Sequence, residues 1–198
     1  MKFIELVEKR KKEVRKENLK LVREEINNNW VQEKILSYCE RQGDDFSKAE
    51  VEKQILDNDI VASFFAKDPS KQNITEKLVE EILKIEKLPA VGKNCVRFTQ
   101  DGTITNKVGV DVSKSADFKD GEFYYTQKYT HEGGGAQDNQ YNDVVDFLIK
   151  GSKKNKVGAI LDGEYWENKR TELEEYFQAN PNVRITSVDR FRGEMIED

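Results

Sequence analysis

The sequence predicts a mixed α/β (α+β) fold, in which a helical N-terminal region precedes a mixed β-sheet core flanked by helices. The first 86 residues place apolar side chains at helical spacing along several charged segments. After them come short segments rich in β-branched and aromatic residues, separated by Asp-Gly turns. A continuous apolar run at 157–161 is typical of a strand buried on both faces. Helical patterns stand on either side of that run, and such alternation favours a sheet covered by helices.

The length of 198 residues indicates one compact domain with two regions. We expect a helical region over 1–86, a sheet core over 87–198, and packing of a helix at 73–86 onto that core. The net charge of −5 argues against a non-specific polyanion binder, but it is compatible with a local basic groove. No apolar run is long enough to cross a bilayer and the first helix is charged, so the expected location is the cytoplasm.

The two cysteines do not indicate a metal site. Cys39 and Cys95 lie far apart without a CxxC spacing, and the chain has a single histidine, His131. Zinc is therefore not indicated, and two reduced thiols are expected in a cytoplasmic protein. His131 is interpreted as a surface residue.

The N-terminal region is predicted to be almost entirely helical. Val7, Val14 and Leu21 recur every seven residues in the first helix. Ser47 followed by Glu50 forms the sequence signature of a capping box at a helix start. The predicted helices span 1–29, 30–41, 47–55, 60–66 and 73–85. A run of four basic residues at 9–12 has two interpretations, a contact with phosphates or a solvated helix face balanced by nearby glutamates.

A hairpin is the central feature of the sheet region. Asp120-Gly121 lies between two strand-like segments at 108–118 and 122–130, and Asp-Gly is a strong two-residue turn signal. Pairing across that turn places Asp117 opposite Tyr124, so that Asp117, Thr126 and Lys128 share one face. A slip of one residue, or a bulge, would bring Gln127 to that face instead. The other predicted strands lie at 95–99, 103–105, 157–161 and 183–185, with Val188 as an optional extension of the last, and the predicted helices lie at 138–150 and 166–177.

From residue 73 the order of helix, three strands, helix and strand resembles the common core of the PD-(D/E)XK nucleases. In that superfamily an Asp opens the second strand and the (D/E)XK triplet lies on the third, so that two acids bind Mg²⁺ and the Lys polarises the attacking water. The resemblance implies Asp117 as the first acid and Lys128 as the lysine, with Asp117 and Gln127 as metal ligands. The chain departs from the pattern at two positions, with Ala116 instead of Pro and Thr126 instead of the second acid. The Gln127 carbonyl oxygen or the Glu132 carboxylate can replace that acid, and Asp111 is the alternative to Asp117.

The segment after Lys128 resembles certain type II restriction endonucleases. An aromatic stretch leads into Gly133-Gly134-Gly135, and Asp162-Gly163 precedes Trp166. The resemblance implies that Gly134 approaches the DNA backbone, because glycine lets phosphates reach main-chain N–H groups. Amide side chains suit bidentate contacts to adenine, and the candidates here are Gln137, Asn139 and Asn142.

The function implied is that of a sequence-specific, Mg²⁺-dependent endodeoxyribonuclease of the type II restriction kind, acting on double-stranded DNA. Its catalytic residues would be Asp117, Gln127, Lys128 and Glu132. A homodimer is expected, since twofold protein symmetry matches a palindromic DNA site. Two alternatives stay open: a DNA-binding or partner protein that has lost catalysis, and an α/β interaction domain without a nucleic-acid role.

Overall fold

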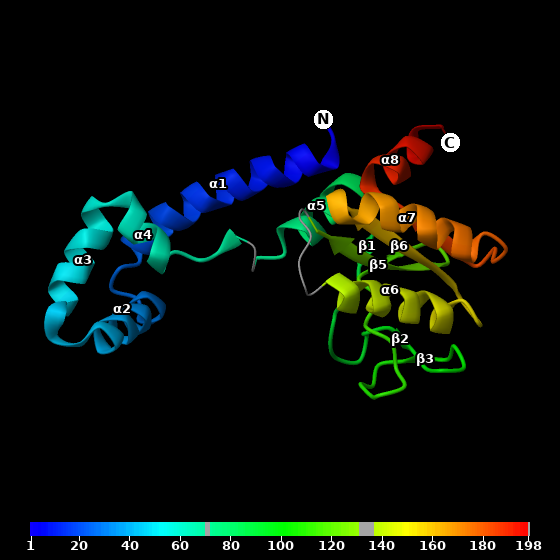
Figure 1. Cartoon of the computed structure of the whole chain (residues 1–198), viewed down its shortest axis with the longest axis horizontal. Helices are drawn as coiled ribbons and strands as arrows, with labels where there is room; N and C mark the ends of the chain where they lie inside the picture. Colours follow the sequence, from blue (N-terminus) through cyan, green and yellow to red (C-terminus); the bar gives the residue numbers. More distant parts are fainter. Residues whose placement is uncertain (70–71, 131–136, 198) are drawn as a thin grey trace. The chain divides into compact units, whose positions relative to one another are not determined.

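The computed structural model describes residues 1–69, 72–130 and 137–197, and it has the mixed α+β class predicted from the sequence (Figure 1). The chain divides into two compact units. One consists of Met1–Leu6 and Thr75–Asp198 and is called the sheet unit below; the other consists of Val7–Ile74 and is called the helical unit.

The helical unit is built from amphipathic helices around a small apolar core. Its helices are α1 (Phe3–Glu24, whose first turn belongs to the sheet unit), α2 (Asn29–Gln42), the short 3₁₀ helix η1 (Gly43–Asp45), α3 (Lys48–Asp57) and α4 (Asp59–Phe65). The core includes Val22, Ile35, Ile55 and Phe65. The predicted capping box is confirmed, because Ser47 accepts a hydrogen bond from the Glu50 backbone and the Glu50 carboxylate accepts one from the Ser47 backbone. Local signals were therefore sufficient to place these helices.

The sheet unit contains a five-stranded mixed sheet and a separate two-stranded one. Its elements are α5 (Ile74–Leu83), β1 (Glu86–Lys87), β2 (Arg97–Phe98), β3 (Ile104–Thr105), β4 (Phe118–Asp120), β5 (Phe123–Tyr129), α6 (Gln137–Gly151), β6 (Lys156–Asp162), α7 (Glu164–Phe177), β7 (Val183–Thr186) and α8 (Val188–Glu197). The order in the large sheet is β1-β4-β5-β6-β7, with β5 in the middle. Strands β1, β4 and β5 run antiparallel, whereas β5, β6 and β7 are parallel.

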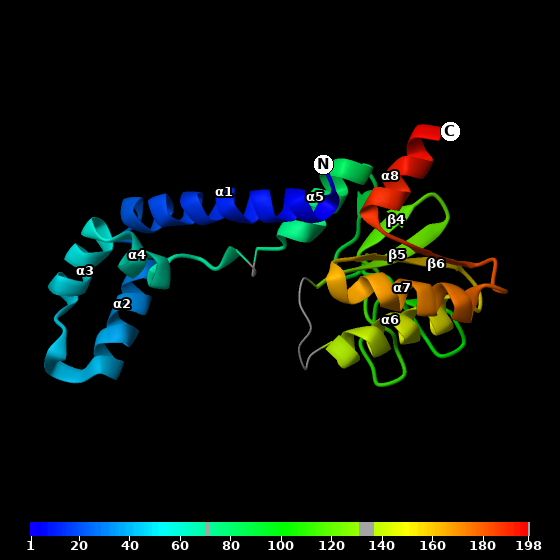
Figure 2. The same cartoon turned by 45° about the horizontal axis from the view of Figure 1, so that its top comes forward.

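Helices α6 and α7 cover one face of the large sheet (Figures 1 and 2). Their apolar side chains pack with the β6 residues of that face, and the cluster includes Phe147, Leu161 and Trp166, all fully buried. On the other face, Tyr125 packs against Phe191 of α8. The predicted strand at 157–161 is confirmed as a central strand buried from Val157 onward.

The strand predicted at 108–118 is wrong for most of its length, since only Phe118–Asp120 joins the large sheet. The preceding residues instead contact the β2–β3 hairpin. The Ser113 N–H donates to the Phe98 carbonyl at 2.9 Å, and the Ser113 hydroxyl accepts from the Phe98 N–H at 2.9 Å. The predicted strands at 95–99 and 103–105 therefore pair with each other and do not supply the first strand of the large sheet. Strand β1 takes that position beside β4.

The register predicted for the central hairpin is also wrong. The ladder pairs Phe118 with Tyr125 and Asp120 with Phe123, so Asp117 does not lie opposite Tyr124. The two-residue loop is Gly121-Glu122 rather than Asp120-Gly121, and only Gly121 has a positive φ, of 53°. Such a loop matches the pattern in which glycine occupies the first turn position.

The last part of the chain differs from the prediction as well. Val188 begins helix α8 instead of extending the last strand, and its N–H donates to the buried Asp162 carboxylate. In the part of the chain that is described, no helix is both long enough and apolar enough to cross a membrane.

Candidate functional site

Asp117 lies at the start of the central hairpin, where the pairing of the two strands is irregular. Its N–H donates to the Tyr125 carbonyl at 2.8 Å, although the ladder pairs Tyr125 with Phe118. Its carbonyl accepts from the Leu88 N–H at 2.9 Å, which joins it to the segment after β1. An extra residue of this kind is common where a strand must re-aim a side chain.

The carboxylate of Asp117 is held against β5. Its Oδ2 atom accepts the Gln127 N–H at 2.7 Å and the Thr126 hydroxyl at 3.2 Å. Both hydrogen bonds from described residues go to the same oxygen, so they leave Oδ1 for another partner. Desolvation raises the pKa of Asp117, and the Lys128 charge together with these hydrogen bonds opposes the rise.

Glu76 is a neighbour that the sequence did not single out. It lies in the first turn of α5, and its charge adds to the raised pKa of Asp117, which shows that the two carboxylates share one electrostatic environment. The Lys87 ammonium pairs with Glu76 Oε2 at 2.8 Å. The only sequence signal was an acidic residue at the start of the helix that precedes the sheet. Nothing in that local pattern connects it with a hairpin some forty residues later.

The residues of β5 that were predicted as catalytic do not all share a face. Strand alternation puts Thr126 and Lys128 on the side of their β6 register partners Ala159 and Leu161, and Gln127 on the opposite side with Ile160. Gln127 is buried, and its Nε2 atom has no hydrogen-bond partner among the described residues. Gln127 thus reaches Asp117 through its main-chain N–H, while Thr126 reaches it through its side chain.

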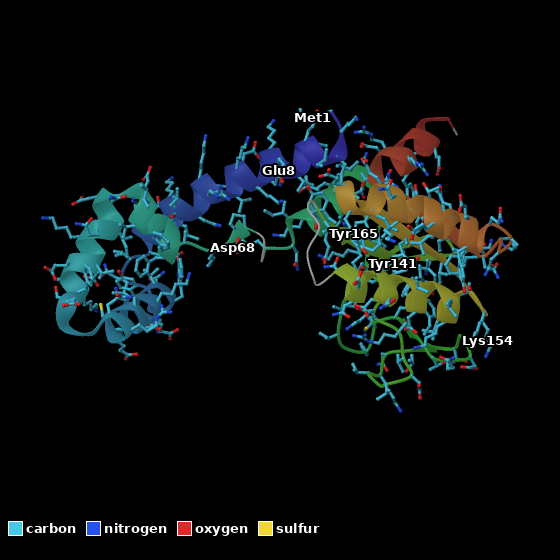
Figure 3. All side chains as sticks on the ribbon, in the orientation of Figure 1. Met1, Glu8, Asp68, Tyr141, Lys154 and Tyr165 are labelled. Carbon is cyan, nitrogen blue, oxygen red and sulfur yellow. The ribbon has the colours of Figure 1, made fainter. Side chains whose placement is uncertain are left out.

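Other polar residues gather where β5 and β6 end. The Thr130 hydroxyl donates to the side-chain Oε1 atom of Gln140 at 3.1 Å and accepts from the Trp166 indole at 3.3 Å. Asp162 is buried at the end of β6. Figure 3 shows Tyr141 and Tyr165 next to each other at the starts of α6 and α7, and the Lys169 ammonium lies 5.2 Å from the Tyr141 ring centroid. A polar and aromatic border therefore follows the carboxyl ends of the two central strands.

The predicted DNA-contacting residues are only partly described. Glu132, Gly134 and the lone histidine lie outside the described residues, and so does the side chain of Gln137. Asn139 and Asn142 are exposed on α6, and Asp111 is exposed in the turn that precedes Val112. Hydrogen bonds therefore join Asp117 to Thr126 and to the Gln127 main chain, and the charges of Lys128 and Glu76 act on the same carboxylate. The DNA contacts stay predictions.

These residues fit a magnesium ion. Mg²⁺ takes oxygen ligands, keeps several of its waters, and is usually held in proteins by one or two carboxylates. Asp117 offers its Oδ1 atom and Glu76 a second carboxylate, while a cation would offset the burial that disfavours the charged form of Asp117. Among the described residues, three or more His, Cys, Asp or Glu side chains do not gather into a group, so an all-protein cage is not the expected form of the site.

Comparison with known proteins gave no match to this chain, whether with family models, with curated protein sequences or with solved structures.

Proposed function

We propose that this protein is a magnesium-dependent endodeoxyribonuclease of the PD-(D/E)XK type, which cleaves double-stranded DNA at a specific sequence as type II restriction enzymes do. The observation that carries the proposal is the contact of the Asp117 carboxylate with β5 beside Lys128, on a central hairpin. The order α5, β1, β4, β5, α6, β6 also supports it, once the separate hairpin β2–β3 between β1 and β4 is set aside, because this is the order that the resemblance implies. Action as a homodimer belongs to the same proposal.

Each residue has a distinct task in this proposal. Asp117 and Glu76 would hold the magnesium ion, which supplies neutralisation of the phosphate charge and activation of a water. Lys128 places a positive charge beside Asp117 and would orient the nucleophile and stabilise negative charge on the phosphate. Thr126 and the Gln127 N–H fix Oδ2 of Asp117, so that the carboxylate is already oriented before substrate binds.

The decisive variant is Asp117→Asn. The amide oxygen can still accept the Gln127 N–H, so the hairpin should persist, but the anionic ligand is lost. We expect Mg²⁺-dependent cleavage of supercoiled plasmid DNA to fall by more than about 100-fold. Binding of the same DNA in Ca²⁺, measured by electrophoretic mobility, should change little.

A matched control is Asp111→Asn, which removes an exposed carboxylate from the same loop region. It should cleave at the wild-type rate. Wild-type cleavage by Asp117→Asn would refute the assignment. If the wild-type protein bound DNA without cleaving it, the alternative of a DNA-binding protein that has lost catalysis would be favoured. That alternative is motivated by Thr126, which stands where the resemblance implies an acid.

A further inference from the structure

The helical unit carries a groove that the nuclease site does not use. The groove has a volume of about 730 Å³ and lies between α2 and the end of α4. Its walls combine aromatic rings, Trp30, Tyr38 and Phe64 among them, with the cations Lys34, Arg41 and Lys67. Among the lining residues that the structure describes, Glu33 is the only acidic one. A concave surface with three cations, one acid and several rings suits an anion that also carries a flat apolar group.

The cations of the groove are held in place. The ammonium groups of Lys34 and Lys67 lie 5.2 Å and 4.7 Å from the centroid of the Trp30 ring. The Lys34 ammonium also donates to the Phe65 carbonyl at 2.7 Å, and Arg41 Nε donates to the Ser37 carbonyl at 3.0 Å. One indole ring thus fixes two positive charges near each other, and ligand binding would have little side-chain entropy left to remove.

Phe64 is the opposite of a core aromatic. Its side chain is 78% exposed, whereas the adjacent Phe65 is buried against Tyr38. Phe64 borders this groove and also a second hollow, whose lining includes Arg15, Lys67 and Asp68. A third hollow at Phe64 is lined in part by Asp45 and Glu50, so the cations lie on the side of the groove and the second hollow. An exposed ring beside a group of cations is the arrangement by which proteins stack a nucleobase while neighbouring charges hold the phosphates.

We propose that this groove binds an unpaired stretch of DNA, with a base stacked on Phe64 and its phosphates on Lys67, Arg41 and Lys34. The inference rests on the proposed function in taking DNA as the strand. Paired bases in a duplex have no free face for Phe64, so the occupant is a strand in which bases have left the stack. A second copy of this chain is a poorer occupant, because a twofold contact through this face would bring the same three cations together.

The test is binding of a fluorescent single-stranded oligonucleotide to the full chain in EDTA, which prevents cleavage. Phe64→Ala should weaken binding by roughly 5- to 150-fold, the range that stacking on one aromatic side chain supplies. Leu56→Ala, which shortens another exposed apolar side chain outside the groove, should bind as the wild type does.

Lys67→Gln should weaken binding and reduce the dependence of affinity on salt by about one counterion, whereas Lys53→Gln should not.

Trp30 supplies an internal reporter, because it lines the groove while the other tryptophan, Trp166, is fully buried in the sheet unit. The oligonucleotide should quench tryptophan emission, and Trp30→Phe should remove the quenching. The affinity for a blunt duplex of the same sequence should be the same in the wild type and in Phe64→Ala. A free nucleoside monophosphate should compete with the oligonucleotide only at much higher concentration.

Equal affinity of wild type and Phe64→Ala for the single strand would overturn the proposal. Self-association through this face is the competing explanation. It would replace the proposal if the wild type were an oligomer in solution, Phe64→Ala were a monomer, and both bound the oligonucleotide equally. Because Asp117→Asn keeps the groove intact, loss of cleavage in that variant with normal single-strand binding separates the two sites. Normal cleavage by Asp117→Asn would refute the nuclease assignment and leave the groove result standing.

Discussion

Asp162 is a buried acid with few compensating contacts. Desolvation raises the pKa of Asp162 to about 7, although the Val188 N–H and the charge of Arg170 oppose that rise. Arg170 itself donates to the Leu161 carbonyl at 2.6 Å rather than directly to the acid. The carboxyl group is therefore expected to be neutral in much of the folded population below neutral pH.

This predicts a pH dependence of stability with a definite sign. Between the ordinary Asp pKa of 3.8 and about 7, the folded protein holds a proton that the unfolded chain has lost. The stabilisation from Asp162 should be complete below about pH 4 and should disappear as the pH rises towards 7. In Asp162→Asn the amide oxygen can still accept the Val188 N–H, but the titration is gone.

The measurement is the free energy of urea unfolding from pH 4 to 7. The wild type should lose stability relative to Asp162→Asn over this range. Asp120→Asn, at the exposed end of the hairpin strand, should follow the wild type. Parallel curves for wild type and Asp162→Asn would contradict the prediction.

The candidate site shows how far single residues can be predicted. Asp117 and Lys128 could be predicted as neighbours because both belong to one hairpin, where a short turn fixes which side chains come close. Their role in a site stays a prediction. The exact register depended on whether Gly121 took the first or the second turn position, and the local sequence allowed both. Glu76 came from a helix outside the hairpin, so only tertiary packing brings it near Asp117.

Among whole elements, the junction of β6 and α7 is the most constrained. Gly163 has a φ of 100°, and a Cβ atom there would lie 2.1 Å from the Thr130 carbonyl oxygen. The Thr130 N–H donates to the Asp162 carbonyl at 3.1 Å, so the ends of β5 and β6 approach each other at this residue. Glycine is required here both for the backbone conformation and for the space.

Gly163→Ala should therefore destabilise the fold by more than about 2 kcal/mol, since the strained φ and the clash add. Gly193 offers the matched control, because it lies within α8 and a Cβ there would have no atom within 4 Å. Gly193→Ala should be neutral or stabilise by up to about 1 kcal/mol, as alanine is the better helix former. Thermal unfolding of both variants checks this, and equal melting temperatures would show that the junction relaxes.

The elements that were predicted well are those with a strong local signal. Helices α3 and α4 have capping side chains at their starts, and β6 has a continuous apolar run. Strand β1 was missed because it consists of Glu86 and Lys87 alone, and it exists through pairing with Lys119 and Phe118 of β4. The segment at 108–117 reads as a strand by its alternating residues, but the Ser113 contacts with Phe98 direct it elsewhere.

Among the described residues, the apolar core around Trp166 in the sheet unit and the core of the helical unit share no residue. Trp30 packs against the core of the helical unit, and Trp166 lies inside that of the sheet unit. Single-tryptophan variants therefore report on the two units separately. Because each core has its own buried surface, a cavity in one should not weaken the other directly.

Ile55→Ala should lower the stability reported by Trp30 by about 2–5 kcal/mol, the usual cost of removing a fully buried aliphatic side chain. The transition reported by Trp166 should change little. Leu161→Ala, at a fully buried residue of β6 in the same core as Trp166, should do the reverse. A common transition for both tryptophans in every variant would mean that the two units unfold as one.

The first turn of α1 has a consequence for synthesis of the chain on the ribosome. The Phe3 N–H donates to the Asp189 carboxylate, 186 residues away, and the Phe3 ring meets the edge of Tyr129 with 6.2 Å between the ring centroids. At roughly 5–20 residues per second, about ten to forty seconds pass between the emergence of Phe3 and that of α8. Until Asp189 is translated, the Phe3 N–H lacks its acceptor, although Tyr129 and the residues of the helical unit have been translated earlier. A nascent chain stalled before α8 should thus expose Phe3 and be a substrate for chaperones that bind apolar segments.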